Sequence, residues 1–263
     1  FIPGQEIAGT VGEVSGESAW KPGDRIASKV FWGGFSEFAE VREDMAIALT
    51  DDVDFARGAA LPVSYMTAMV ALHDSVDVGP QDSVLVHAAA GGVGLAAVEI
   101  AHAAGAKVIA TAGSPEKLAL AKDHGADFGV SYREDNWKDA VKEATDGRGA
   151  TIIVDPVGGD VATESLRCIA RRGTLLIVGF ASGKIAQLPS NHLLLKSATA
   201  RGVLWDHDRD GPMIARMTKR IQDLLQQGKI NPVVRSDFKL EDLPKALDAL
   251  SNRKSVGKLV LTL

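Results

Sequence analysis

The chain has 263 residues, 46% of them hydrophobic and 24% charged, and a formal net charge of −5. This length can bury a full core in one large domain or two smaller ones, and the acidic balance gives no electrostatic reason to expect a DNA, RNA or anionic-membrane partner. The single cysteine, Cys168, excludes an internal disulfide and a cysteine-rich zinc site, so we expect a reducing compartment, the cytoplasm.

The first fifty residues have the pattern of short strands joined by tight turns, without helical periodicity. β-rich segments at 7–14, 25–31 and 35–41 alternate with turns that contain glycine or proline. This pattern predicts an all-β region, part of a barrel.

The pattern changes near residue 59, where a buried helix is expected over 64–74. After it, short apolar runs alternate with segments of helical length, which indicates βαβ units and a parallel sheet. The expected strands are 83–87, 107–111, 128–131, 151–154 and 174–178, and the expected helices are 93–104, 115–124, 136–144 and 161–169. A further strand (199–204), two helices (212–227 and 241–250) and a closing strand (258–263) follow.

A turn of small residues joins the strand at 83–87 to the next helix. Such a strand–turn–helix unit directs backbone N–H groups and a helix N-terminus at a pyrophosphate. Gly91 allows the backbone to approach the phosphates, and Gly94 allows the helix to pack against the strand. Ala89 replaces the first glycine of the usual G-x-G-x-x-G, so the context favours dinucleotide binding more than the motif does. A glycine-rich turn without a ligand is the alternative.

The end of the next strand predicts the choice of cofactor. NAD-binding versions have an acidic residue about twenty positions on, for the ribose 2′-hydroxyl. Here the strand ends Thr111-Ala112-Gly113-Ser114 without an acid. Ser114 as a donor and Lys117 one turn on suit the 2′-phosphate of NADPH, although a solvated helix lysine is the alternative for Lys117.

Several motifs occur in the order of a known family. They are Gly4-Gln5-Glu6, Gly23-Asp24-Arg25, Gly33-Gly34-Phe35, Ala60-Leu61-Pro62, the turn at 89–94, Gly179-Phe180-Ala181-Ser182-Gly183 and Gly257-Lys258-Leu259. Over its whole length the chain resembles the medium-chain dehydrogenase/reductase family, and within it the zinc-independent quinone oxidoreductase (zeta-crystallin-like) branch. The fold class implied is α/β: a doubly wound parallel Rossmann sheet (65–205) with a partial β-rich GroES-like catalytic domain (1–64 and 206–263).

The resemblance also implies a cofactor site for NADPH. The residues it places at the pyrophosphate are Ala90, Gly91, Gly92 and Val93. Those around the 2′-phosphate and adenosine are Gly113, Ser114, Lys117 and Tyr132. Those on the nicotinamide side are Val178, Gly179, Phe180, Ala181, Val203, Leu204 and Trp205, with Thr67 beside the ring.

Two departures from the zinc-dependent members bear on metal binding. Those members have Gly-His-Glu at the place of Gly4-Gln5-Glu6 and a cysteine at the place of Val63. A catalytic zinc needs three protein ligands, so replacing two of them predicts a site without metal. The structural four-cysteine lobe is absent from the sequence too.

The reaction that the resemblance implies is hydride transfer to a quinone or another conjugated carbonyl, such as an enone. Ser64, Tyr65 and Thr67 are the candidate hydroxyls for holding the developing oxyanion. An enoyl-thioester reductase of the same superfamily, or a non-catalytic NADPH-binding or structural protein, are the alternatives. Relatives pair the sheet edge at 201–205 across a two-fold axis, so we expect a homodimer.

Some weaker signals favour structural roles. The acidic run Asp206-His207-Asp208-Arg209-Asp210 is expected to be a solvated loop, not a metal site. His87 is expected to be a structural hydrogen-bonding residue, and Cys168 to be packed in a helix. The first motif lies well inside the catalytic domain of the family, so we expect an incomplete front to that domain and an open substrate pocket.

Overall fold

The structure is a computed structural model that describes residues 1–252 and 255–263. It divides into two compact units. The smaller one contains residues 1–66, 206–221 and 231–263, and the larger one contains residues 67–205 and 222–230.

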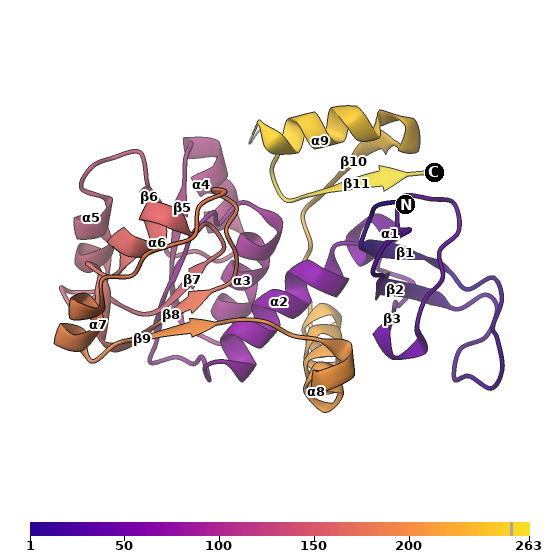
Figure 1. The fold of residues 1–263 in the computed structure, drawn as a ribbon, viewed down its shortest axis with the longest axis horizontal. Coiled ribbons are helices and arrows are strands. Elements are labelled where there is room, and N and C mark those ends of the chain that lie inside the picture. Colours follow the sequence, from indigo (N-terminus) through magenta and orange to yellow (C-terminus); the bar gives the residue numbers. More distant parts are fainter. Residues whose placement is uncertain (253–254) are drawn as a thin grey trace. The chain divides into compact units, whose positions relative to one another are not determined.

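A six-stranded sheet with the order β6-β5-β4-β7-β8-β9 forms the centre of the larger unit (Figure 1). Every neighbouring pair is parallel. The chain starts at β4, winds outward to β6, then returns to the other side of β4, so the topological switch point lies between β4 and β7. The strands are β4 (Ser83–Val86), β5 (Lys107–Ala112), β6 (Phe128–Ser131), β7 (Ala150–Asp155), β8 (Ile169–Ile177) and β9 (Thr199–Gly202). The predicted doubly wound parallel sheet is confirmed.

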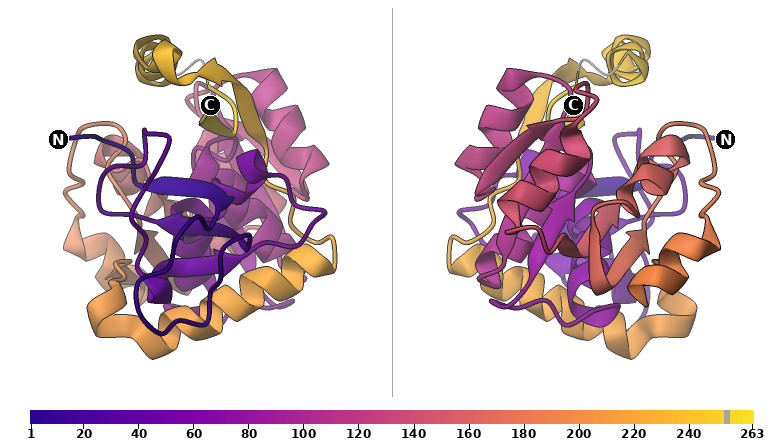
Figure 2. Two further views of the ribbon diagram at one scale, coloured as in Figure 1. Left: turned by 90° about the vertical axis from the view of Figure 1, so that its right-hand side faces the viewer. Right: turned by 90° about the vertical axis from the view of Figure 1, so that its left-hand side faces the viewer.

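Helices flank this sheet on both faces (Figure 2). They are α3 (Gly92–Ala103), α4 (Pro115–Asp123), α5 (Trp137–Ala144), α6 (Gly159–Ser165) and α7 (Ser190–Lys196). The central strands are therefore covered twice, and Leu85, Ile109, Ile153 and Leu175 are completely buried. This double burial explains why the strands are continuous apolar runs in the sequence, without polar alternation.

The smaller unit contains two separate sheets. An antiparallel sheet has the order β1-β2-β3, formed by β1 (Glu6–Thr10), β2 (Arg25–Lys29) and β3 (Ala46–Ala48). The other is a parallel pair, β10 (Val234–Lys239) and β11 (Lys258–Thr262). The helices are α1 (Phe55–Gly58), α8 (His207–Gln226) and α9 (Leu243–Ser251), with the latter part of α8 in the larger unit.

One helical segment of the described residues, Phe55–Asp74, is long and apolar enough by length and composition to cross a membrane. It includes α2 (Met66–Met69) between two π-helical turns, Leu61–Tyr65 and Val70–Asp74. Of its most apolar stretch, 67% is buried inside the protein. Leu61, Met69 and Leu72 are among the most deeply buried side chains, as the expected buried helix requires.

Several predicted elements have wrong bounds: the strand predicted at 7–14 ends at Thr10, the one predicted at 174–178 begins at Ile169, and the helix predicted at 212–227 begins at His207. Two further differences have a local cause. Residues 35–41 form no strand, because the Ser36 hydroxyl lies 2.6 Å from both the Gly33 and the Phe38 carbonyl oxygens, either of which can accept its proton, and closes a local turn. The helix predicted at 161–169 ends at Ser165, because Ile169 already pairs with Ala150 at the start of β8. Cys168 therefore lies in the turn between them and not in a helix. It is 1% exposed, and burial raises its pKa to about 12, so the predicted packing role is confirmed.

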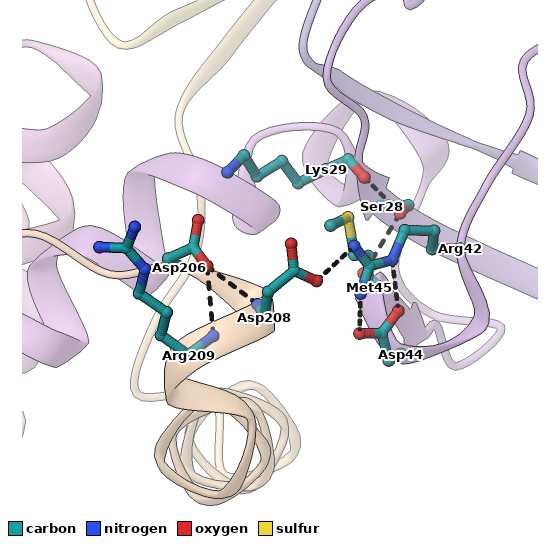
Figure 3. A network of polar contacts seen from close by, with 8 residues as sticks. All are labelled: Ser28, Lys29, Arg42, Asp44, Met45, Asp206, Asp208 and Arg209. Carbon is teal, nitrogen blue, oxygen red and sulfur yellow. Dashed lines mark hydrogen bonds and ion pairs between the residues drawn. The ribbon is translucent and has the colours of Figure 1, made fainter.

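The acidic run before Pro212 is not the solvated loop that the sequence predicted. The Asp206 carboxylate accepts hydrogen bonds from the N–H groups of Asp208 and Arg209, at 3.0 and 3.2 Å, and so caps α8. Figure 3 shows Arg42 between two acids, with bonds of 2.7 Å to both Asp44 and Asp208. An acidic residue is favourable at a helix N-terminus, so the run begins a helix. The helix bends at Asp210, where φ is −114°.

Candidate functional site

The turn after β4 lies at the topological switch point. Ala88 has a positive φ of 49°, and its carbonyl accepts a hydrogen bond of 2.9 Å from the Gly91 N–H. A Cβ atom at residue 94 would lie 2.2 Å from the Ala88 oxygen, so only glycine allows α3 to start this close to the turn. Gly91 is the N-cap of α3. The N–H groups of Gly92 and Val93 are in the first helical turn, where no helix carbonyl can bond to them, and they suit an anion.

The residues predicted for the adenosine end lie at the tips of β5 and β6. A Cβ atom at residue 113 would lie 2.4 Å from the Tyr132 hydroxyl oxygen, so Gly113 is what lets this ring lie against the end of β5. Ser114 caps α4, and its hydroxyl accepts a 3.4 Å bond from the Lys117 N–H. The pKa of Glu116 is lowered by hydrogen bonds to its carboxylate from its own backbone N–H and from this same hydroxyl. The structure thus brings Gly113 and Tyr132 together and puts Lys117 in the first turn of α4.

A buried carboxylate that the sequence analysis missed organises the other side of the switch point. Asp155 ends β7, and its carboxylate accepts hydrogen bonds from the N–H groups of Val157 and Gly158, at 2.8 and 3.1 Å. Burial raises the pKa of this carboxyl, and the two backbone donors oppose that shift. The signal was available: a charged residue closes the apolar run 152–154 and precedes Pro156.

The segment after β8 is layered on the Asp155 turn. The N–H groups of Val178 and Gly179 donate to the Asp155 carbonyl, at 2.9 and 3.3 Å, and that of Ala181 donates to Pro156 at 3.0 Å. A Cβ atom at Gly158 would lie 2.7 Å from the Phe180 ring. Four predicted nicotinamide-side residues, Val178, Gly179, Phe180 and Ala181, are thus held by one turn that the sequence analysis had not singled out.

Thr67 and Trp205 are brought together across 138 positions of sequence. The Trp205 indole N–H donates a 3.0 Å hydrogen bond to the Thr67 hydroxyl oxygen. Trp205 is buried, whereas Leu204 beside it is 85% exposed. The strand β9 ends at Gly202, but the Val203 N–H still bonds to Ile177 at 2.9 Å. The predicted end of that strand, at 204, is therefore two residues too late, although one ladder bond continues past Gly202.

Ser64 and Tyr65 belong to the smaller unit, and they are 3% and 2% exposed. Lys258 forms an ion pair with Glu6 and approaches the Ser64 hydroxyl at 3.4 Å. The other Glu6 oxygen accepts a 3.0 Å bond from the Val63 N–H. Ser64 therefore adjoins an ion pair that ties β1 and β11 to the helical turn at 61–65. The sequence had shown Glu6 and Lys258 only as parts of motifs.

The two positions that carry zinc ligands in other members have different partners here. The Gln5 amide reaches the Phe31 carbonyl at 3.5 Å, and Val63 offers only its backbone. In the part of the chain that the structure describes, no three His, Cys, Asp or Glu side chains are grouped so as to hold a metal ion. The absence of a catalytic zinc stays a prediction.

Comparison with known proteins gives consistent results. Residues 92–223 match the family model described as zinc-binding dehydrogenase. The chain is 39% identical over 267 aligned residues to quinone oxidoreductase-like protein 2 of Rattus norvegicus, covering 100% of this chain and 76% of that protein.

Solved structures are similar over nearly the whole chain. A quinone oxidoreductase of Pseudomonas syringae pv. Tomato DC3000 is 33% identical with a TM-score of 0.90, covering 99% of this chain and 82% of that one. The Escherichia coli quinone oxidoreductase, solved in complex with NADPH, is 30% identical with a TM-score of 0.89, covering 98% and 82%. The chain therefore belongs to the medium-chain dehydrogenase/reductase family, as an oxidoreductase of the quinone oxidoreductase type.

Proposed function

We propose that the protein uses NADPH to reduce a quinone or another conjugated carbonyl, without a catalytic zinc. The observation that carries the proposal is the turn 88–94 at the switch point of the sheet, where Gly94 permits the closest approach of helix to strand. The NADPH bound by the Escherichia coli relative supports this choice of cofactor. When bound, NADPH supplies the hydride.

Different residues of the chain would bind different parts of this cofactor. The N–H groups of Gly92 and Val93 would bind the pyrophosphate through the positive end of α3. No carboxylate ends β5, and Lys117 would supply a positive charge to a 2′-phosphate. The Ser114 hydroxyl would donate to that phosphate by exchanging its present bond to Glu116. The stacked turns at 155–158 and 178–181 would form a rigid wall for the nicotinamide end.

Reduction of a conjugated carbonyl places negative charge on the substrate oxygen, which needs a hydrogen-bond donor. The Thr67 hydroxyl accepts from Trp205, so its own proton remains available for donation. Ser64 and Tyr65 are almost completely buried. Among the three predicted hydroxyls, we therefore favour Thr67 as the group that holds this oxygen.

The proposal is tested by following NADPH oxidation with a panel of quinones, enones and enoyl-CoA thioesters, with and without EDTA. We expect turnover with quinones or enones that EDTA does not reduce. Turnover with enoyl-CoA thioesters alone would identify a thioester reductase instead. NADPH binding without turnover of any acceptor would indicate a non-catalytic NADPH-binding protein. Stoichiometric zinc by elemental analysis would contradict the interpretation of Gln5 and Val63.

A further inference from the structure

His87, the residue between β4 and the phosphate-binding turn, has hydrogen bonds at both of its ring nitrogens. Its Nδ1 atom lies 2.9 Å from the Thr111 hydroxyl on β5, and its Nε2 atom lies 2.8 Å from the Ser165 hydroxyl on α6. The ring is 1% exposed and meets the Trp137 ring of α5 edge-on, with 5.5 Å between the centroids. One imidazole therefore joins four elements of the larger unit.

The hydrogen bonds around His87 have one consistent direction. The Ser165 hydroxyl also lies 2.7 Å from the Val161 carbonyl, which can only accept, so its single proton goes there. The Ser165 oxygen must then accept from His87, which puts the imidazole proton on Nε2. A neutral ring leaves Nδ1 as an acceptor for the Thr111 hydroxyl. This direction uses every hydroxyl proton in the chain Thr111–His87–Ser165–Val161.

The same residues fix the turn on both sides of Ala88. The His87 N–H bonds to the Val154 carbonyl at 3.0 Å, and the Ala89 N–H bonds to the Thr111 carbonyl at 3.0 Å. Ala88 lies between these two anchors in the left-handed region, with φ of 49°, where a non-glycine residue is strained unless its surroundings hold it. Thr111 therefore secures the turn twice: its carbonyl accepts from the Ala89 N–H, and its hydroxyl donates to the His87 ring.

We propose that His87 is a positioning residue for the cofactor: its imidazole, protonated on Nε2, holds the turn 88–91 against β5 and α6, and so aligns the N–H groups that receive the pyrophosphate. The inference rests on the proposed NADPH site, but not on any acceptor or on the hydride transfer. His87 itself need not touch the cofactor.

Cofactor affinity in three variants tests the proposal. We expect His87→Leu to weaken NADPH binding about tenfold, and Thr111→Val to weaken it in the same direction. His87→Gln keeps an amide donor for Ser165 and should recover part of the affinity. In turnover assays the KM for NADPH should rise while kcat at saturating NADPH stays near that of the parent.

A matched control separates positioning from general stability. Val141→Ala removes packing from a residue on α5 that is buried in the same core as Trp137 and has no bond to the turn. It should lower Tm and leave the dissociation constant for NADPH unchanged, measured well below Tm. Unchanged NADPH affinity in both His87→Leu and Thr111→Val would overturn the proposal, as would an equal loss of affinity in Val141→Ala.

The direction of the hydrogen bonds has its own readout in the unaltered protein. Nitrogen NMR of labelled histidine should show His87 with a protonated Nε2 and an unprotonated Nδ1. The opposite tautomer would overturn the arrangement whether or not any variant folds. A parent protein that binds NADPH yet reduces no acceptor would contradict the proposed activity alone, because the affinity comparison would still stand.

Discussion

At the residue scale, the Asp155 carboxylate holds the turn at 155–158 of the candidate site in place. It is fully buried, and it accepts hydrogen bonds from two backbone N–H groups of the turn that supports residues 178–181. Nothing in the apolar pattern of β7 required an acid at its end. Its role depends on a turn geometry that appears only once the chain is folded, which is why sequence periodicity did not reveal it.

Substituting Asp155 should separate its acceptor role from its charge. Asp155→Ala leaves the Val157 and Gly158 N–H groups without their acceptor and should cost about 2–4 kcal/mol. Asp155→Asn keeps an acceptor oxygen and should cost about 1 kcal/mol or less at neutral pH. Burial raises the pKa of Asp155, so its contribution to stability is present at low pH and is lost as the pH rises through the folded value.

Urea unfolding at several pH values measures both effects. The difference in stability between the parent and Asp155→Asn should move in favour of the asparagine variant as the pH rises from about 4 to 7. If Asp155→Ala were as stable as the parent, the carboxylate would not be supporting the turn.

His87 should respond to pH with the opposite sign. Burial lowers its pKa from 6.5 to about 3, so the stabilisation is complete above the unfolded pKa and is lost as the pH falls towards the folded one. Between about pH 7.5 and 4.5 the parent should lose roughly 3 kcal/mol that His87→Gln does not lose, since glutamine cannot be protonated. Equal losses in the two proteins would show that the imidazole is accessible to protons in the folded state.

Lys117 should determine the preference between the two nicotinamide cofactors. The parent should bind NADPH at least tenfold more tightly than NADH, about 1.4 kcal/mol. Lys117→Ala should reduce that ratio and leave NADH affinity nearly unchanged, because only the 2′-phosphate distinguishes the two. Titrations monitored by calorimetry measure both constants. Equal affinities in the parent would contradict the interpretation of the β5 end.

At the element scale, the success of the sequence prediction depended on how each element is buried. Strands β4, β5 and β7 are buried on both faces, so their apolar runs were unambiguous. The segment 35–41 has a similar β-rich composition, but its Ser36 side chain closes a turn, which composition does not show. The helix at 161–169 was extended too far because Ile169 and Ala170 continue an apolar pattern that belongs to the next strand.

The edge strand β9 predicts how two copies of the chain associate. β9 is the last strand of the sheet, so no strand of the described residues pairs with its outer side, and Leu194, Leu195 and Leu204 near it are 79%, 79% and 85% exposed. We propose a homodimer in which two β9 strands pair about a two-fold axis. Leu204→Lys should shift the protein towards monomer in light scattering at micromolar concentration.

A control for this prediction lies on another element. Leu247→Lys introduces the same charge at a half-exposed leucine of α9, in the smaller unit, and should leave the oligomeric state unchanged. A parent protein that is monomeric at this concentration would contradict the dimer, as would a dimer that survives Leu204→Lys unchanged.

At the scale of the whole molecule, the fold class and the family follow from features that are local in sequence. The alternation of strands and helices and the turn at 88–94 were visible without any structure. The contacts that complete the site join distant residues, such as Thr67 with Trp205, Glu6 with Lys258, and His87 with Ser165. Such pairs depend on the order of strands in the sheets and on the packing of helices. Neither can be predicted from the local pattern of a single sequence.

The central claim is that the protein transfers a hydride from NADPH to a conjugated acceptor. The most direct test is to supply NADPH deuterated at the transferable C4 position together with an enone, and to locate the deuterium in the product by NMR. We predict one deuterium on the carbon β to the carbonyl, and a second hydrogen that comes from solvent. NADPH consumption that leaves no deuterium on that carbon would contradict hydride transfer to the acceptor.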